Sequence, residues 1–131
     1  MIVIDSSAII AILKNETEAA PFTEAVGRAE RCFLSAVNYL EVCLVLLGRG
    51  PKAALAYLDP WIERAGIEVV AFDAPLAAVA REASLRFGRG RHPAGLNLGD
   101  CAAYALAKSR DLPLLFKGAD FPKTDIVPAI A

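Results

Sequence analysis

The chain has 131 residues, with 14 basic and 15 acidic side chains and a formal net charge of −1. This length suits one domain spanning residues 1–131, and a hydrophobic content of 56% argues against a disordered chain. The near-neutral total excludes a broadly basic nucleic-acid-binding coat, although residues 81–117 carry seven basic and three acidic side chains, whereas residues 1–80 carry six and ten.

Short apolar segments alternate along the chain with longer helical patterns. The apolar runs predict strands at residues 2–4, 32–34, 67–72 and 112–116, and a short fifth strand at 126–127. Helices are expected at residues 8–13, 16–31, 35–47, 52–65, 73–87 and 100–109, with Ser35 as an N-cap, a break at 48–51 and a loop at 88–99. This alternation predicts an α/β fold with a central parallel sheet of four to five strands.

Neither the cysteines nor the apolar runs indicate secretion or membrane insertion. Cys32, Cys43 and Cys101 lie in apolar stretches without a CxxC pair, which is typical of buried thiols in a reducing cytoplasm. The longest strictly apolar runs, 8–13 and 42–47, fall far short of the ~20 residues that span a bilayer. The N-terminus also lacks the basic start and small-residue cleavage site of a signal peptide, so we expect a cytoplasmic protein.

Four carboxylates stand at positions where they could converge. Asp5, Glu41 and Asp120 each follow a predicted strand, and Asp100 opens a helix that precedes one. Taken singly, Asp5 and Asp100 could be helix N-caps, Asp120 a loop residue, and Glu41 a salt-bridge partner of an arginine. Because the carboxyl ends of parallel strands meet at one edge of a sheet, we also expect these side chains to lie together. Glu41 carries particular weight, since its helix is apolar nearly all round and a lone buried carboxylate is costly unless it is paired or binds a cation.

Converging carboxylates repel one another unless a cation neutralises them. Oxygen ligands favour Mg²⁺ or Mn²⁺, and the chain has no Cys/His cluster for zinc. Such an ion can activate water for phosphodiester hydrolysis. A phosphate ester needs basic residues nearby, and the candidates are Arg86, Arg89, Arg91, His92 and Lys117. The same residues from 86 to 92 are equally compatible with a solvated, charged loop.

Four segments resemble the PIN-domain ribonucleases, specifically the VapC toxins of bacterial toxin–antitoxin pairs. They are MIVIDSSA at 1–8, SAVNYLEV at 35–42, RHPAGLNLGDC at 91–101 and LLFKGADF at 114–121, followed by Thr124-Asp125. They occur in the family's order and spacing, so the resemblance covers essentially the whole chain. Two departures, Ser6 where threonine is common and Ala119 where asparagine or an acidic residue is common, remove no carboxylate.

The resemblance implies a PIN domain, with three α/β/α layers, that acts as a Mg²⁺-dependent endoribonuclease on structured RNA such as tRNA or rRNA. It also implies a homodimer, alone or in a larger toxin–antitoxin assembly, inhibited by a VapB-like antitoxin whose C-terminal segment docks in or beside the site. By position, Asp5 and Asp100 would be the principal metal ligands, Glu41 and Asp120 would act directly or through water, and Ser7 and Asn97 would support them.

Two other functions remain open from the sequence. A phosphorylatable receiver domain also gathers aspartates and a lysine at strand ends, but it needs adjacent acidic residues after the first strand, where this chain has Ser6 and Ser7. A catalytically inactive PIN-like binding partner would retain the fold and show no Mg²⁺-dependent change in melting temperature.

Overall fold

A parallel four-stranded sheet lies at the centre of the computed structural model, which describes residues 1–49 and 52–130. The strand order is β3-β2-β1-β4, and Val3 pairs with both Phe33 and Leu114. The strands are β1 (Ile2–Ile4), β2 (Cys32–Ser35), β3 (Ile67–Val70) and β4 (Leu114–Leu115). The two central strands are buried at every residue, as expected for parallel strands that helices cover on both faces.

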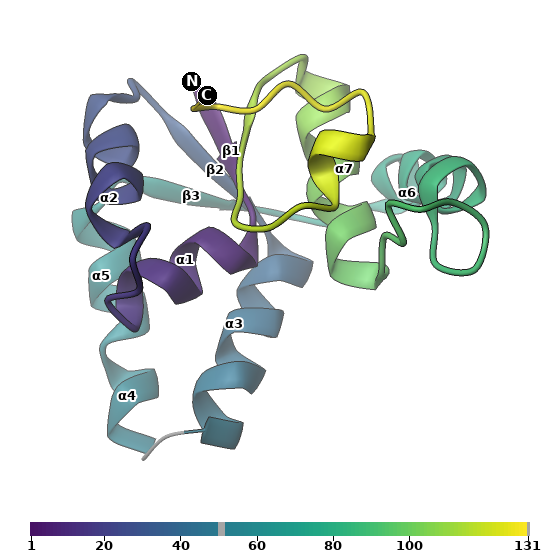
Figure 1. Cartoon of the computed structure of the whole chain (residues 1–131). Helices are drawn as coiled ribbons and strands as arrows, with labels where there is room; N and C mark the ends of the chain where they lie inside the picture. The colour runs from purple at the N-terminus through teal and green to yellow at the C-terminus, as the bar shows by residue number, and fades with distance from the viewer. Residues whose placement is uncertain (50–51, 131) are drawn as a thin grey trace.

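Helices cover both faces of this sheet and produce the predicted three layers (Figure 1). On one face lie α1 (Ser6–Leu13), α2 (Ala19–Arg28), α3 (Ala36–Arg49), α4 (Lys52–Ala56) and α5 (Leu58–Arg64). On the other face lie α6 (Ala74–Phe87) and α7 (Leu98–Arg110), and a 3₁₀ turn, η1 (Phe121–Lys123), follows β4. None of the helices among residues 1–49 and 52–130 is long and apolar enough to cross a membrane.

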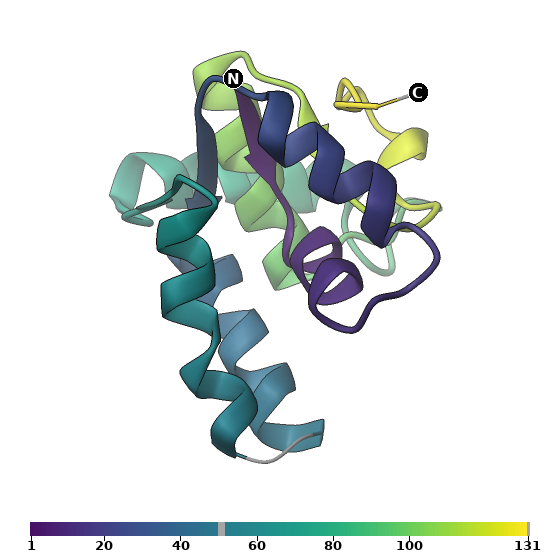
Figure 2. The same cartoon turned by 90° about the vertical axis from the view of Figure 1, so that its left-hand side faces the viewer.

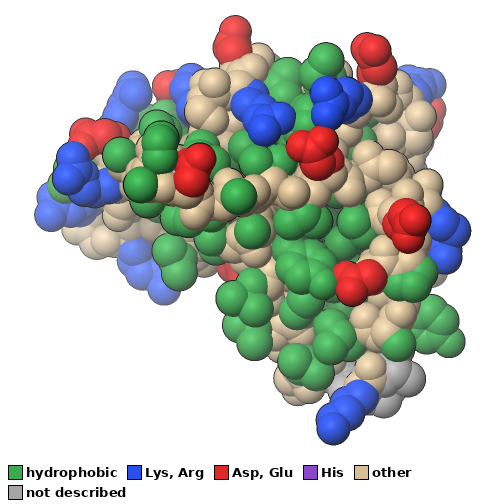
Figure 3. All heavy atoms as spheres, turned by 180° about the vertical axis from the view of Figure 1, so that it is seen from behind, with side chains coloured by type: hydrophobic (Ala, Val, Ile, Leu, Met, Phe, Trp, Pro, Cys, Tyr) green, Lys and Arg blue, Asp and Glu red, His purple; other side chains and the backbone are tan. Residues whose placement is uncertain are grey.

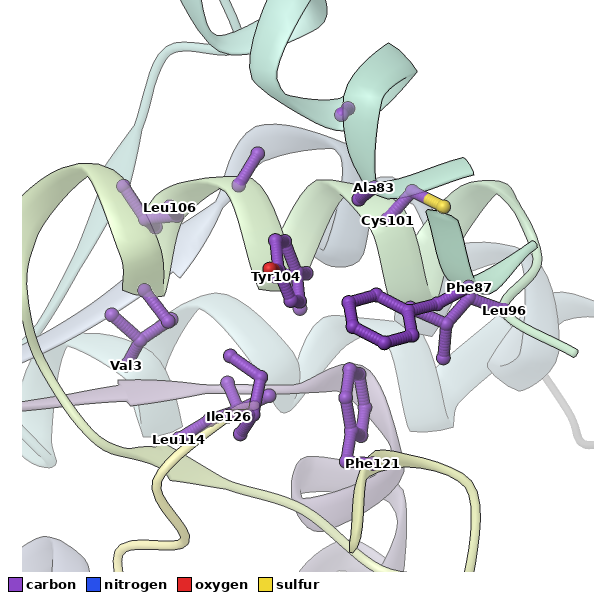
Figure 4. Close-up of a cluster of buried hydrophobic side chains, with 14 of the residues drawn as sticks. Val3, Ala83, Phe87, Leu96, Cys101, Tyr104, Leu106, Leu114, Phe121 and Ile126 are labelled. Carbon is purple, nitrogen blue, oxygen red and sulfur yellow. The ribbon is translucent and has the colours of Figure 1, made fainter. Parts of the chain in front are cut away.

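Two hydrophobic cores follow from the alternation of side chains along β1. Val3 faces the cluster beneath α6 and α7, whereas Ile2 and Ile4 face the cluster beneath α1, α2, α3 and α5. Figure 4 shows the first cluster, in which the ring of Phe87 from α6 points towards Tyr104 of α7, with 5.8 Å between the ring centroids. This packing fixes the position of α7, whose N-terminus contributes to the candidate site.

Several predicted boundaries differ from the structure for reasons of backbone chemistry. The expected fifth strand at 126–127 is wrong within the described residues: this segment makes an isolated parallel bridge between Leu114 and Pro128, through the Leu114 N–H to the Val127 carbonyl and the Ala129 N–H to the Leu114 carbonyl. The helix predicted at 16–31 spans only Ala19–Arg28. The helix predicted at 52–65 is divided into α4 and α5, since Pro60 cannot donate to the Ala56 carbonyl.

The third helix begins and ends close to its predicted bounds. Ser35 is the last residue of β2, and its hydroxyl accepts the Val37 backbone N–H at 3.3 Å, as an N-cap does. The predicted break at 48–51 starts later than expected, because α3 continues to Arg49; Gly50 and Pro51 lie outside the described residues.

The expectation that α3 is buried on most of its faces is wrong. Leu40, Leu44 and Leu47 are 56%, 59% and 47% exposed. In Figures 1 and 2, α3 and α4 extend beyond the sheet as a pair, which leaves these leucines of α3 open to solvent. Seen from behind in Figure 3, hydrophobic side chains gather on this projecting part of the molecule.

Candidate active site

Three strand ends and one helix N-terminus bring the four predicted carboxylates to the same edge of the sheet. Asp5 follows β1, Glu41 lies in the helix directly after β2, Asp120 follows β4, and Asp100 lies in the first turn of α7. Burial is the main cause that raises the pKa of both Asp5 and Asp100, and neighbouring negative charges add to it: those of Asp100 and Glu41 at Asp5, and those of Glu41 and Asp120 at Asp100. The four side chains therefore form one acidic cluster.

Asp5 is the most deeply placed member of this cluster, with 3% of its surface exposed. Its backbone N–H donates to the Leu115 carbonyl at 2.9 Å, which ties the end of β1 to β4. The Oδ2 atom accepts hydrogen bonds from the Ser7 backbone N–H, at 3.0 Å, and from the Ser7 hydroxyl. The Oδ1 atom is buried and has no hydrogen-bond partner among the described residues.

Burial dominates the electrostatics of Asp5. It raises the pKa of this carboxyl from 3.8 to about 7, even though the Ser7 hydrogen bonds favour the charged form. An ionised carboxylate held in this position without a counter-charge is therefore costly, and a cation beside Oδ1 would remove that cost. The predicted N-cap role is also confirmed, because Asp5 caps α1 through the same Ser7 N–H.

Glu41 is held by neutral donors rather than by an arginine. Its Oε1 atom accepts the Ser6 hydroxyl at 2.6 Å and the Asn38 side-chain amide at 3.2 Å. Among the described residues, Glu41 makes no salt bridge, so the arginine pairing considered from the sequence is not present there. Two hydrogen bonds to one oxygen fix the orientation of the carboxylate without neutralising its charge.

Asp100 is the third residue of α7 rather than its N-cap, which corrects the simplest interpretation of the sequence. The N-cap is Asn97, whose Oδ1 accepts the Asp100 N–H at 2.9 Å, while Asp100 Oδ2 accepts the Asn97 N–H at 3.1 Å. This capping box starts the helix two residues earlier than predicted and points the Asp100 carboxylate back towards the helix N-terminus. Burial is the main cause that raises the pKa of Asp100, and the positive charge of Arg89 opposes it.

The supporting residues connect the separate segments of the site. The Ser7 hydroxyl donates to Asp5 and accepts the Lys117 backbone N–H at 3.0 Å, so one side chain links α1 to the segment after β4. Asn97 positions Asp100 as described above. Asp120 is exposed and precedes η1, which leaves its carboxylate accessible to solvent.

Three further residues complete the site, and the sequence reasoning did not assign them a role. Asn38, which is fully buried, donates to Glu41 and to the Gly99 carbonyl at 3.0 Å, and thereby joins α3 to α7. A Cβ atom at Gly99 would overlap the Glu41 carboxylate, so only glycine allows this approach. Asn38 could have been found from its spacing, because residues three apart share a helix face; the contacts of Ser6 and Gly99 are tertiary.

Two of the predicted RNA-binding residues in the 86–92 segment, Arg86 and His92, already contact other side chains or backbone groups of the protein. The Arg86 guanidinium lies 3.5 Å from Asp125 and stacks over the Phe87 ring, 4.7 Å from its centroid. The ring of His92 packs edge-on against Phe87 at 5.1 Å, and its Nδ1 accepts the Ala94 N–H at 3.0 Å. These two side chains therefore have local structural partners within the protein.

The remaining basic candidates lie closer to solvent or to the carboxylates. Arg89 and Arg91 are exposed, and the charge of Arg89 acts directly on Asp100. The Lys117 ammonium lies 3.2 Å from Glu16 and 3.5 Å from Glu18. These two ion pairs would have to break before Lys117 could bind an RNA phosphate. We therefore expect Arg89 and Arg91 to be the readiest contacts for an anion near the site.

The donor set fits a hard divalent cation that retains part of its water shell. Every side-chain donor in the cluster is an oxygen, and the unpartnered Asp5 Oδ1 is available to a ligand. Within the described residues, no three His, Cys, Asp or Glu side chains lie close enough together to hold an ion by themselves. Mg²⁺ usually keeps several waters and binds through one or two carboxylates, so a cation here would contact few of these oxygens directly and would reach the others through water.

Comparison with known proteins identifies the family of the chain. The PIN-domain family profile matches residues 2–127. This chain belongs to the PIN-domain family. Ribonuclease VapC30 of Mycobacterium tuberculosis is 46% identical over 124 residues, covering 95% of each chain, which places this protein among the VapC ribonucleases of that family.

Solved structures show the same fold at low sequence identity. VapC20 of M. tuberculosis, described as a sarcin-ricin loop cleaving toxin, matches with a TM-score of 0.75 and 17% identity and covers 97% of both chains. A toxin–antitoxin complex from Klebsiella pneumoniae matches with a TM-score of 0.75 and 15% identity, covering 95% of this chain and 93% of the other. The predicted PIN fold is thus confirmed, and the receiver-domain alternative is excluded.

Proposed function

We propose that this PIN domain, spanning residues 1–131, is a Mg²⁺-dependent endoribonuclease toxin that cuts structured RNA, tRNA or rRNA, through metal-activated water. Mn²⁺ is expected to substitute, because it accepts the same oxygen ligands. The observation that carries the proposal is the buried Asp5 carboxylate, which has one unpartnered oxygen and lies near the carboxylates of Asp100 and Glu41. Family membership indicates that the chain is a nuclease, and the acidic cluster offers oxygen ligands for the cation that would activate water.

The residues of the chain have distinct roles in this proposal. Asp5 and Asp100 would bind the cation directly, and Glu41 and Asp120 would bind it directly or hold its water ligands. Ser7 fixes the Asp5 carboxylate, and Ser6 and Asn38 fix that of Glu41, so little reorganisation is needed when substrate arrives. When bound, the cation supplies a more acidic water and stabilises charge on the phosphate. Arg86, Arg89, Arg91, His92 and Lys117 are the proposed RNA contacts.

The direct test compares two aspartates at opposite ends of α7, Asp100 in its first turn and Asp111 at its C-cap. The Asp100→Asn variant should lose at least about a hundredfold in Mg²⁺-dependent RNA cleavage, because it removes a charge that holds the cation. Asp111→Asn is the matched control: Asp111 is exposed at the opposite end of the helix, and its φ of 53° is one that asparagine tolerates. Equal cleavage by the two variants would overturn the proposal, and a wild-type protein inactive on tRNA and rRNA would favour the binding-partner alternative.

A VapB-like antitoxin is the proposed inhibitor. A groove of about 320 Å³ lies beside Glu41 and is lined by Val37, Leu40, Leu44, Asn97, Leu98 and Gly99. Its leucines are unusually exposed for their size, with Leu98 at 76%, and an apolar patch next to an active site suits an apolar segment of a protein inhibitor. Leu44→Asp should weaken inhibition by the antitoxin while leaving RNA cleavage intact.

The proposal also includes a homodimer in the cytoplasm, alone or in a larger toxin–antitoxin assembly. The exposed apolar surface of the α3 and α4 pair supports association, and the free thiols Cys32, Cys43 and Cys101 suit a reducing compartment. Light scattering of the purified protein should report twice the chain mass of 13.9 kDa. A mass of one chain at micromolar concentration would contradict the dimer.

A further inference from the structure

A second cavity lies beside the acidic cluster, between α6 and the N-terminus of α7. It has a volume of about 500 Å³, within the ~300–1,000 Å³ typical of sites for small organic groups. Its interior is formed by the buried Ala80, Leu96 and Cys101 together with the half-buried ring of Phe72. None of the roles assigned above to the carboxylates, nor the groove beside Glu41, uses these interior side chains.

The first turn of α7 both lines the cavity and carries one of the carboxylates. Asn97 and Cys101 line the cavity, and Asp100 lies between them in the same helical segment. The Asn97 backbone N–H donates to the Asp100 carboxylate at 3.1 Å, so the cavity wall and the site are in direct contact. A group seated in the cavity would therefore lie next to whatever Asp100 binds.

The charged side chains that line the cavity are both arginines, and one of them, Arg81, also pairs with the exposed Glu82 at 3.3 Å. Arg81 and Arg89 both line it, and Arg89 is close enough for its charge to act on Asp100. An apolar interior excludes a phosphate or a hydrated ion, whereas guanidinium groups at the mouth attract one. This combination suits a ligand that has a flat apolar part and an attached anion. A nucleotide has both, because its base can stack on an aromatic side chain while its phosphate contacts arginine.

We propose that this cavity binds one unpaired nucleobase of the RNA, immediately beside the phosphodiester that is cleaved, with Arg89 contacting the adjoining phosphate. This inference rests on the proposed function and specifies its substrate: a base must leave the stack to enter, so loops and bulges are favoured over continuous helices. The apolar side chain of a protein partner is the competing occupant, but two arginines at the mouth favour the anionic ligand.

The test fills the cavity from an exposed position. Ala77 and Ala78 are neighbouring exposed residues of α6, and only Ala77 lines the cavity, so Ala77→Trp and Ala78→Trp form a matched pair. Ala77→Trp should raise the KM for a loop-containing RNA about tenfold or more and broaden the preference for the base at the cut, because it removes one stacked base from the bound state. Ala78→Trp should behave as wild type, and the melting temperatures of both should match.

The remaining measurements separate this inference from the proposed function. The Kd of a fluorescent single-stranded oligonucleotide, titrated with Ca²⁺ in place of Mg²⁺ and shown by electrophoresis to be intact afterwards, reports binding alone. If wild-type protein cuts no RNA, the proposed function fails, and a weaker Kd for Ala77→Trp than for Ala78→Trp would still support the cavity. Equal KM, Kd and cut-site preference for the two variants would overturn the inference, as would a loss confined to antitoxin binding.

Discussion

Replacing Asp5 by asparagine should stabilise the metal-free protein, and increasingly so as the pH rises. Asp5 is buried at the end of β1 with its pKa raised from 3.8 to about 7, mainly by burial. In the unfolded chain the carboxyl releases its proton near its ordinary value, whereas the folded chain retains the proton to about neutral pH. The folded state thus binds more protons between these values, and its stability falls as the pH rises through them.

The size of the effect follows from that pKa difference. Each pH unit between the two values corresponds to about 1.4 kcal/mol, so Asp5 should lower the free energy of unfolding of the wild type by about 4 kcal/mol between pH 4 and pH 8. Asparagine carries no such dependence. Its amide can lack an acceptor where Oδ1 now lies, at a cost of ~1–3 kcal/mol, but this cost is the same at every pH and does not affect the slope.

Urea denaturation at several pH values in the presence of EDTA measures this difference. The gap between Asp5→Asn and wild type should widen by about 4 kcal/mol from pH 4 to pH 8, while Asp111→Asn should follow the wild type. Added Mg²⁺ should restore stability to the wild type at pH 8 and should not stabilise Asp5→Asn, because only the ionised carboxylate binds the cation. A gap that stays constant with pH would refute the reasoning that burial dominates Asp5.

Three other substitutions test separate contacts of the site. Gly99→Ala should fold but lose RNA cleavage, because the new Cβ displaces the flexible carboxylate end of Glu41. Melting curves and cleavage assays measure the two effects, and full cleavage activity would show that the close approach of Gly99 to Glu41 does not matter. Asn38→Ala should lower the free energy of unfolding by about 1–3 kcal/mol, measured by urea denaturation, because it removes two buried hydrogen bonds. Arg91→Ala should reduce the slope of log K for RNA against log salt by about 1 if Arg91 contacts phosphate, and Arg31→Ala, on a surface pair with Glu68, should leave it unchanged.

Much of the fold could be predicted because its signals are local. The β-branched segment before Asp5 and the apolar segment before Ser35 indicate buried strands, and their alternation with helices indicates a parallel sheet. The boundaries were less accurate where a single proline decided them, as at Pro60. Exposure of Leu40 and Leu44 could not be predicted, because an apolar helix pattern does not say whether a second element covers it.

The sequence by itself predicted which carboxylates share one edge of the sheet, because parallel strands place their carboxyl ends at a common edge and Asp5, Glu41 and Asp120 each come after a strand. Only the tertiary structure decided how each carboxylate is held. The hydrogen bond from Ser6 to Glu41, the one from Asn38 to the Gly99 carbonyl, the close approach of Gly99 to Glu41, and the burial that raises the pKa of Asp5 all join segments far apart in the chain. Local propensities act over a few residues, whereas desolvation and these contacts depend on which segments pack together.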